Sequence, residues 1–450
     1  MMNNIPTEII RNIIFQLIGA TRWVPQIDER CPITSLAIYA AVSRQWQTIV
    51  ESITFRHLIL NADRLDAAQR EKYLTPLRLG YIRYIWYDFE FPAHNLTTST
   101  NPEEDYNDHL VFSRSAKQLL NVLSQIPPRL EPVVALEIFI TPPKKYALQL
   151  LRNETKMSRE TTQVLLGKVK PEYVELFKDW DVDIAQVPSV FYFRVEPGSR
   201  SILFSPSSIN RIASKMPRLS KIEWWLTDEQ NIDMNVQTSQ RTMFAQTLDI
   251  VPMSVRSFIL NFGRQPPRPG ANNPDSIVPL NAQEDILSLS FYSFTQRKGL
   301  DDFYLVARVD STILLPREAK PDALWPSIRL YHLELKEQLA SGESIAQPRA
   351  GKGFVHNQAI MNRFAIAAAT CAPRMPKVEE LSVIHHGRSH MGICFNTRSK
   401  DVPCLEFVSS PDLPEANEEA LGLWKEAVKA HGLEWNLNVT NDLDKVYHFY

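Results

Sequence analysis

The chain has 450 residues, of which 44% are hydrophobic and 22% are charged, a composition typical of folded proteins and unlike that of disordered chains. Lysine and arginine (49) nearly balance aspartate and glutamate (51), so no excess of positive charge favours binding to nucleic acid or anionic lipid. The four cysteines, Cys31, Cys371, Cys394 and Cys404, are too scattered for a disulfide framework. No basic leader and no apolar run of roughly 20 residues occurs, so we expect a protein of the cytoplasm, the nucleus or both, with no membrane partner.

The N-terminal segment predicts an amphipathic helix. Ile9, Ile13 and Leu17 recur every four residues, which places them on one helical face. Pro6 suits the first helical position, where no amide hydrogen is needed, and Glu8 lies in the first turn, where the helix dipole favours a negative charge.

Two further short helices are expected before residue 58. One covers residues 35–42, and Ser43 can cap the next, in which Trp46, Ile49 and Ile53 recur at helical spacing. Each helix is too short to be stable alone in water. The three helices must therefore pack on one another or on a partner.

These segments resemble the F-box family, in which a Leu-Pro-x-Glu-like start, an apolar helix and a Val-Cys/Ser-Arg-x-Trp segment occur in this order. The matching segments are residues 5–8 (Ile-Pro-Thr-Glu), 9–17 and 42–46 (Val-Ser-Arg-Gln-Trp). The resemblance implies a three-helix F-box over residues 1–58 that docks on the Skp-type linker subunit of a cullin ubiquitin ligase, while the remaining chain selects a protein substrate. It assigns linker binding to Ile5, Pro6, Ile9, Ile13, Leu36, Val42 and Trp46.

The connection between the first two helices is unusual for that family. Residues 18–33, which include Trp23 and Pro25, are longer than the usual connection, so we expect an insertion there. An alternative interpretation is a small helical bundle that caps the chain's own body, with Ile9, Ile13 and Trp46 as ordinary core residues.

The rest of the chain alternates helical stretches with short apolar strands. Helices are expected over 209–216 and 364–371, and strands over 82–91, 133–140, 222–226, 255–262, 303–309, 328–335 and 381–385. Such alternation predicts parallel pairing, either in a doubly wound sheet or in a solenoid of leucine-rich-repeat type.

A short motif favours the solenoid. Met-Pro-x-Leu/Val-x-x-Ile/Leu occurs at Met216 and at Met375, with a looser copy over residues 128–133, as a repeat would predict. We therefore expect an α/β fold in which residues 59–400 form a degenerate leucine-rich-repeat-like solenoid and 401–450 a C-terminal strand-helix-strand cap. An F-box followed by such units also resembles fungal F-box proteins with a divergent leucine-rich-like region.

Strand alternation suggests which side chains could bind a substrate protein. If Ile222, Trp224 and Leu226 face the core, Trp225 faces outward. Similar counting gives the substrate-face candidates Trp86, Phe139, Trp225, Tyr304, His332 and His386. The alternative is that helices cover both faces of the sheet, in which case these side chains are core.

Two other functional classes are alternatives to a ligase adaptor. One is a scaffold protein outside ubiquitin ligases. The other is a metal enzyme built on His385, His386, His390, Cys394 and Cys404, but only the spacing from the first two histidines to His390 suits zinc. Neighbouring residues of a strand also point to opposite faces. Because phosphate-binding and nucleophile-elbow motifs are missing as well, we expect no metal, no cofactor and no catalytic residue.

Overall fold

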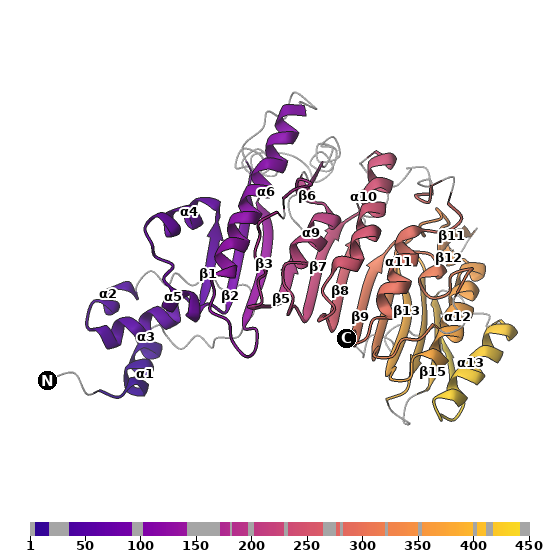
Figure 1. The fold of residues 1–450 in the computed structure, drawn as a ribbon. Coiled ribbons are helices and arrows are strands. Elements are labelled where there is room, and N and C mark those ends of the chain that lie inside the picture. Colours follow the sequence, from indigo (N-terminus) through magenta and orange to yellow (C-terminus); the bar gives the residue numbers. More distant parts are fainter. Residues whose placement is uncertain are drawn as a thin grey trace.

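The computed structural model describes residues 5–17, 36–91, 102–141, 172–180, 182–196, 202–228, 233–263, 276–279, 282–319, 323–349, 353–398, 403–410 and 417–441. In these residues the chain forms eleven α-helices and one large sheet of twelve strands, with two small two-stranded sheets beside it. The fold is α/β with a mostly parallel, open sheet (Figure 1). The expected insertion at residues 18–33 lies outside the described residues.

The helices are α1 (Thr7–Leu17), α2 (Ala37–Ala40), α3 (Arg44–Thr54), α4 (Ala62–Arg70), α5 (Pro76–Tyr81), α6 (Pro102–Ser124), α9 (Pro206–Ala213), α10 (Met234–Thr247), α11 (Ile286–Thr295), α12 (Gln358–Cys371) and α13 (Glu418–Ala430). The large sheet contains β1 (His57–Asn61), β2 (Tyr84–Glu90), β3 (Val134–Thr141), β5 (Val190–Val195), β7 (Lys221–Thr227), β8 (Ser257–Gly263), β9 (Asp302–Ala307), β10 (Leu330–Leu335), β13 (Glu380–His386), β14 (His390–Asn396), β15 (Leu405–Ser410) and β16 (Leu437–Thr440). The small sheets pair β4 (Glu172–Val174) with β6 (Ile202–Phe204), and β11 (Ala346–Arg349) with β12 (Gly353–His356).

The strands of the large sheet lie side by side in the order in which they occur along the chain. Neighbours are parallel from β1 to β13. A doubly wound sheet contains a point where the strand order reverses, and the described strands contain no such point. Every strand expected from the sequence pattern is present, with ends that differ by at most two residues.

Parallel pairing was the wrong expectation near the C-terminal end of the sheet. Strand β14 runs antiparallel to both β13 and β15. Only residues 387–389 separate β13 from β14, and a connection this short can join antiparallel strands but not parallel ones. A Cβ atom on Gly387 would lie 2.5 Å from Nε2 of His385, so this tight turn depends on glycine. Strand β15, helix α13 and strand β16 follow in that order and extend the sheet, with β16 parallel to β15.

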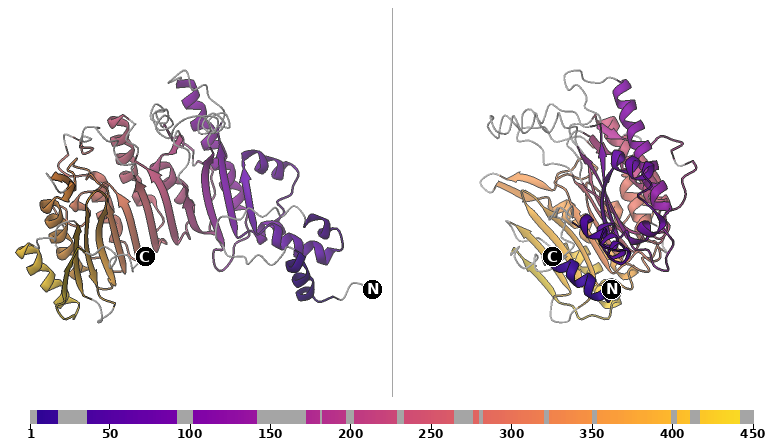
Figure 2. Two further views of the ribbon diagram at one scale, coloured as in Figure 1. Left: turned by 180° about the vertical axis from the view of Figure 1, so that it is seen from behind. Right: turned by 90° about the vertical axis from the view of Figure 1, so that its left-hand side faces the viewer.

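The helices that follow the strands pack against one face of the large sheet, which we call the core face. Phe112 of α6 contacts Phe89 of β2, and Phe291 of α11 contacts Phe258 of β8. At the far end, Trp424 of α13 packs on Phe395 of β14. The strands can be seen from the opposite side in Figure 2, and we call that side the open face.

The two copies of the methionine-proline motif build the same turn. Met216 and Met375 are both fully buried, and their carbonyl groups accept hydrogen bonds of 3.0 Å from the amides of Leu219 and Val378. Each turn leads directly into the next strand. The motif is therefore a helix-to-strand connection whose apolar residues anchor in the core.

The three N-terminal helices form a small core of their own. Its buried residues are Ile10, Ile14, Leu36, Ile49, Val50 and Ile53. The side chain of Ser43 accepts a hydrogen bond of 3.3 Å from the amide of Trp46, so the expected N-cap of α3 is confirmed. Nε2 of Gln45 donates to the carbonyl of Ile5 at 2.9 Å and holds the start of α1 against α3.

Helix α3 attaches this unit to the sheet because β1 begins three residues after the helix ends. Nη2 of Arg78 in α5 lies 2.6 Å from Oε1 of Glu51 in α3, and the Arg78 guanidinium lies over the ring of Phe55. The hydrogen bond to Arg78 lowers the pKa of Glu51, and the same bond raises the pKa of Arg78.

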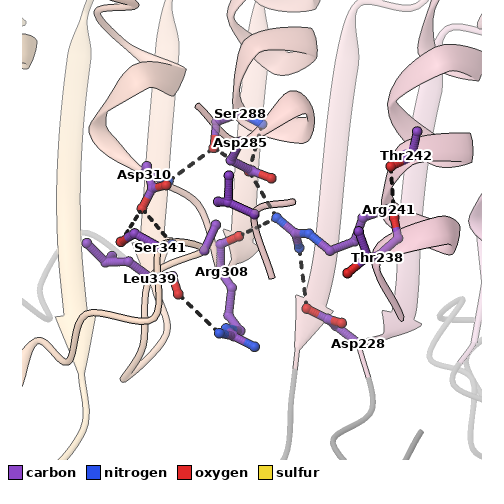
Figure 3. A network of polar contacts seen from close by, with 12 residues as sticks. Asp228, Thr238, Arg241, Thr242, Asp285, Ser288, Arg308, Asp310, Leu339 and Ser341 are labelled. Atoms are coloured by element: carbon purple, nitrogen blue, oxygen red, sulfur yellow. Dashed lines mark hydrogen bonds and ion pairs between the residues drawn. The ribbon is translucent and has the colours of Figure 1, made fainter. Parts of the chain in front are cut away.

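A buried network of charges joins the carboxyl ends of β7 and β9 to helices α10 and α11 (Figure 3). The guanidinium of Arg241 lies 3.3 Å from Asp228 and 3.0 Å from Asp285, and all three residues are almost completely buried. Burial alone would lower the pKa of Arg241, but the two carboxylates raise it above its ordinary value. Asp285 also accepts hydrogen bonds from the amide and hydroxyl of Ser288 and so caps α11.

Removing Arg241 should destabilise the protein strongly, because Asp228 and Asp285 would remain buried without their shared cation. We expect Arg241→Met to lower the free energy of unfolding by about 3–5 kcal/mol in urea denaturation. Arg363→Met is the matched control, because Arg363 pairs with Glu343 on the surface and should cost less than about 1 kcal/mol. Equal losses in the two variants would contradict a stabilising role of the network.

Candidate functional site

The N-terminal helical unit exposes apolar side chains although it has its own core. In α1, Ile10 and Ile14 are buried, whereas Ile9 and Ile13 are 50% and 39% exposed. Ile10 and Ile14 therefore form the internal face of the helix, whereas Ile9 and Ile13 lie on its solvent face. An exposed apolar face on a helix that already packs on its inner side is a typical protein-binding surface.

The residues assigned to linker binding occupy three environments. Pro6, Ile9, Ile13 and Val42 are exposed, and Ile5 and Trp46 are partly buried against the small core. Leu36 is only 2% exposed, because it packs inside the unit with Ile10 and Ile14. In this arrangement Leu36 stabilises the unit and has no surface to offer a partner.

Two exposed apolar residues were not identified from the sequence. Ile38 in α2 is 68% exposed, and Phe15 in α1 is also exposed. Ile38 lies four residues before Val42, so helical spacing could have linked the two. Phe15 gave no such signal, because it lies outside the four-residue repeat of Ile9 and Ile13.

The second candidate surface is the open face of the large sheet. Strand register aligns one row of side chains across all twelve strands, in the order Ile59, Trp86, Glu137, Arg194, Glu223, Ile259, Tyr304, His332, Ser382, Cys394, Glu406 and Asn438. The row mixes aromatic, charged and polar residues. Residues on the core face of the same strands are almost entirely apolar.

All six substrate-face candidates lie on the open face. Trp225 is 39% exposed, whereas its neighbour Trp224 on the core face is fully buried. The remaining candidates, except for one histidine, are partly buried; they are Trp86, Phe139, Tyr304 and His386. His332 differs because its ring stacks on Tyr304, with 4.4 Å between ring centroids, and it is only 6% exposed.

Carboxylates and tyrosines form a hydrogen-bonded group on the open face of β2, β3, β5 and β7. The hydroxyl of Tyr84 donates to Glu137 at 2.6 Å, and the hydroxyl of Tyr192 donates to Glu223 at 2.7 Å. Arg194 lies between the two pairs, with its Nε 3.6 Å from Oε1 of Glu223. Burial and the bond to Glu137 raise the pKa of Tyr84, so this hydroxyl stays a donor at neutral pH.

Histidines gather on β10, β13 and β14. Nδ1 of His332 and Oγ of Ser382 share a hydrogen bond of 2.6 Å, and His386 lies near His390 with ring centroids 6.0 Å apart. Burial lowers the pKa of His332 to about 3, with a smaller contribution from His386. Burial also lowers the pKa of His386, so His332 and His386 are both neutral at physiological pH.

The histidines and cysteines of the alternative metal-enzyme interpretation do not converge. His385 faces the core, where its Nδ1 hydrogen bonds the carbonyl of Leu335 at 2.9 Å, whereas His386 lies on the open face. Cys394 is on the open face as well, and Cys404 is buried. In the described part of the chain, no three histidine, cysteine or acidic side chains could hold a metal ion together.

Sequence reasoning missed the charged members of the open face, Glu137, Arg194 and Glu223. A signal was available for one of them. Glu137 lies in the apolar stretch Val134–Thr141, and a single carboxylate in such a strand has to point away from the core. The partners of Glu137 lie on other strands, and only the register of the sheet identifies them.

No protein-family model matches this chain, and a search of curated proteins finds no significant match. In the described residues, no helix combines the length and the apolar character that crossing a membrane requires.

Two buried histidines should make stability depend on pH. Burial lowers the pKa of His332 to about 3 and that of His385 to about 4, whereas both would titrate near 6.5 in the unfolded chain. Between these values the unfolded state binds more protons, so the free energy of unfolding falls as the pH falls. From pH 7.5 to 5, we expect a loss of about 2 kcal/mol for each histidine in urea denaturation.

The variant His332→Gln should remove one histidine's share of this pH dependence, whatever its effect on stability at neutral pH. If the free energy of unfolding of His332→Gln depended on pH as steeply as that of the original protein, the lowered pKa assigned to His332 would be contradicted.

Proposed function

We propose that this chain is a non-catalytic, substrate-selecting adaptor of a cullin ubiquitin ligase, acting in the cytoplasm or nucleus. The observation that carries the proposal is a three-helix unit with its own core that leaves Ile9 and Ile13 exposed beside a separate open sheet face. An adaptor needs two such surfaces, one for the ligase and one for the substrate. The F-box resemblance of residues 5–17 and 42–46 assigns the helical unit to the Skp-type linker.

Within the helical unit, the exposed residues Pro6, Ile9, Ile13 and Val42 are the proposed linker contacts, with Ile5 and Trp46 at the edge of the small core. Leu36 is left out of this set because it is buried. Apolar side chains of this kind contribute binding energy only when a partner covers them, since they gain nothing from exposure to water.

The body is proposed to be a degenerate leucine-rich-repeat-like solenoid. Three features support this interpretation: strands in chain order, helices on one face, and the recurring turn at Met216 and Met375. Such a fold offers one long uncovered sheet face for binding. We assign substrate binding to this open face, with Trp225 as its most exposed aromatic residue.

The joint between the two parts suits this role. Helix α3 leads into β1 almost without a linker. The Arg78–Glu51 ion pair and the contact of Arg78 with Phe55 stabilise this connection. A short and rigid connection of this kind would hold a bound substrate at a fixed position relative to the ligase.

Acidic substitutions at the exposed isoleucines should abolish linker binding without unfolding the chain. We expect Ile9→Asp with Ile13→Asp to weaken binding of the full-length protein to purified Skp-type linker by more than about 100-fold, since two buried apolar anchors are lost. Calorimetry measures the affinity, and capture from cell extract should lose both linker and cullin.

The matched control is Asn12→Asp with Gln16→Asp, which adds the same charge at the same spacing on exposed positions of α1. Its linker affinity should stay within about threefold of the original. If the unaltered chain captures neither linker nor cullin, the ligase assignment fails and a scaffold outside ubiquitin ligases becomes the better interpretation.

A further inference from the structure

Aromatic rings and carboxylates alternate on the open face of β2, β3 and β7. Trp86 of β2 is paired in register with Glu137 of β3, and Asp88 of β2 is paired with Phe139 of β3. The rings of Trp86 and Phe139 contact each other edge to face, with centroids 6.3 Å apart. Each ring therefore has a carboxylate on the neighbouring strand.

A similar pairing occurs on β7. Trp225 lies two residues beyond Glu223 on the same face of the strand, about 7 Å away along the backbone. We call Trp86, Asp88, Glu137, Phe139, Glu223 and Trp225 the acidic-aromatic patch.

The protein holds one of its own lysines with this combination of groups. Nζ of Lys221 lies 5.1 Å from the centroid of the Tyr192 ring and 3.7 Å from Oε2 of Glu223. A ring face and a carboxylate together attract a cation more strongly than either does alone. The same pair of groups recurs in the acidic-aromatic patch without a cation of the chain at Trp86 or Trp225 in the described residues.

Among the described residues of β2, β3, β5 and β7, negative charge exceeds positive charge on the open face. The carboxylates on this part of the face are Asp88, Glu90, Glu137, Glu196 and Glu223, and the cations are Arg194 and Lys221. Glu137 is only 1% exposed, and its Oε1 has no hydrogen-bond partner in the described structure. Because neighbouring side chains cover Glu137, a ligand does not touch it, and the partly exposed Asp88 and Glu223 are the carboxylates of the patch that a ligand reaches.

We infer that the acidic-aromatic patch binds an extended protein segment rich in lysine and arginine. This inference rests on the proposed function and names the class of substrate that the open face selects. The excess of carboxylates attracts basic side chains, and the rings cover their aliphatic stems while attracting their cationic ends. The same charge repels the phosphates of nucleic acid.

The dimensions suit a short segment. Strands β2 and β7 are three strand spacings apart, or about 14 Å, and an extended chain rises about 3.3 Å per residue. Trp225 also lies about 7 Å further along its strand than the position in register with Trp86, so the two positions are about 16 Å apart and about six residues span them.

The test uses the full-length protein and fluorescein-labelled peptides about 12 residues long, in which serine alternates with lysine, glutamine or glutamate. Fluorescence anisotropy measures the affinities. We expect binding of the lysine peptide, weakened by salt, and no measurable binding of the other two. Equal binding of all three peptides, or none of the lysine peptide, would overturn the inference.

Conservative variants then locate the binding site. Asp88→Asn with Glu223→Gln should weaken lysine-peptide binding about tenfold, and Trp225→Ala about fivefold. Glu419→Gln with Glu426→Gln removes the same charge from exposed positions of α13 and should change the affinity less than about twofold. If both double variants weakened binding of the lysine peptide equally, the peptide would be attracted by the net charge of the protein alone. The acidic-aromatic patch would then be rejected as the binding site.

Linker binding is measured on the same preparations. If the patch variants bind the linker normally but lose the lysine peptide, the open face is the site of peptide binding. If linker binding fails in the unaltered chain while the peptide still binds, only the ligase proposal is overturned.

Discussion

The structure depends on one constraint: the chain returns to the same face of the large sheet after each parallel strand. Parallel neighbours cannot be joined by a hairpin, so a helix or an extended segment must cross over the sheet. Between β1 and β13 strand order follows chain order, and the described helices of the crossovers lie on one face, so they leave the opposite face free (Figure 1 and Figure 2). Both the core and the candidate binding face follow from this arrangement.

On the core face, this arrangement of the strands places aromatic side chains in a continuous row. Phe193, Trp224, Phe258, Phe303 and Tyr331 contact one another in succession, with ring centroids 5.1 to 6.0 Å apart. From β5 to β10, rings on neighbouring strands are therefore buried against one another, within one continuous core of the sheet. Burial of this size contributes most of the free energy that keeps the strands and helices together.

On the open face, the same register brings together polar residues that are far apart in the chain. Tyr84 and Glu137 are 53 residues apart but hydrogen bond across β2 and β3. At the carboxyl ends of the strands, charged side chains are buried, and each buried charge needs an opposite charge beside it. There Arg241 neutralises Asp228 and Asp285 together, which fixes α10 and α11 over the end of the sheet.

Local patterns in the amino-acid sequence predicted the strands of the body and the cap of α3. Alternation of apolar residues located the body strands and placed Trp225 opposite Trp224, because a strand turns successive side chains to opposite faces. Local hydrogen bonding made the cap at Ser43 predictable, since donor and acceptor are three residues apart.

Only the tertiary structure decided which apolar residues reach a surface. Ile9 and Leu36 both suited a binding face, but packing of the three helices exposes one and buries the other. His332 points to the open face as expected, yet Tyr304 and Ser382 on neighbouring strands cover it. Local patterns predict the direction of a side chain, whereas its burial depends on residues that the fold brings from elsewhere in the chain.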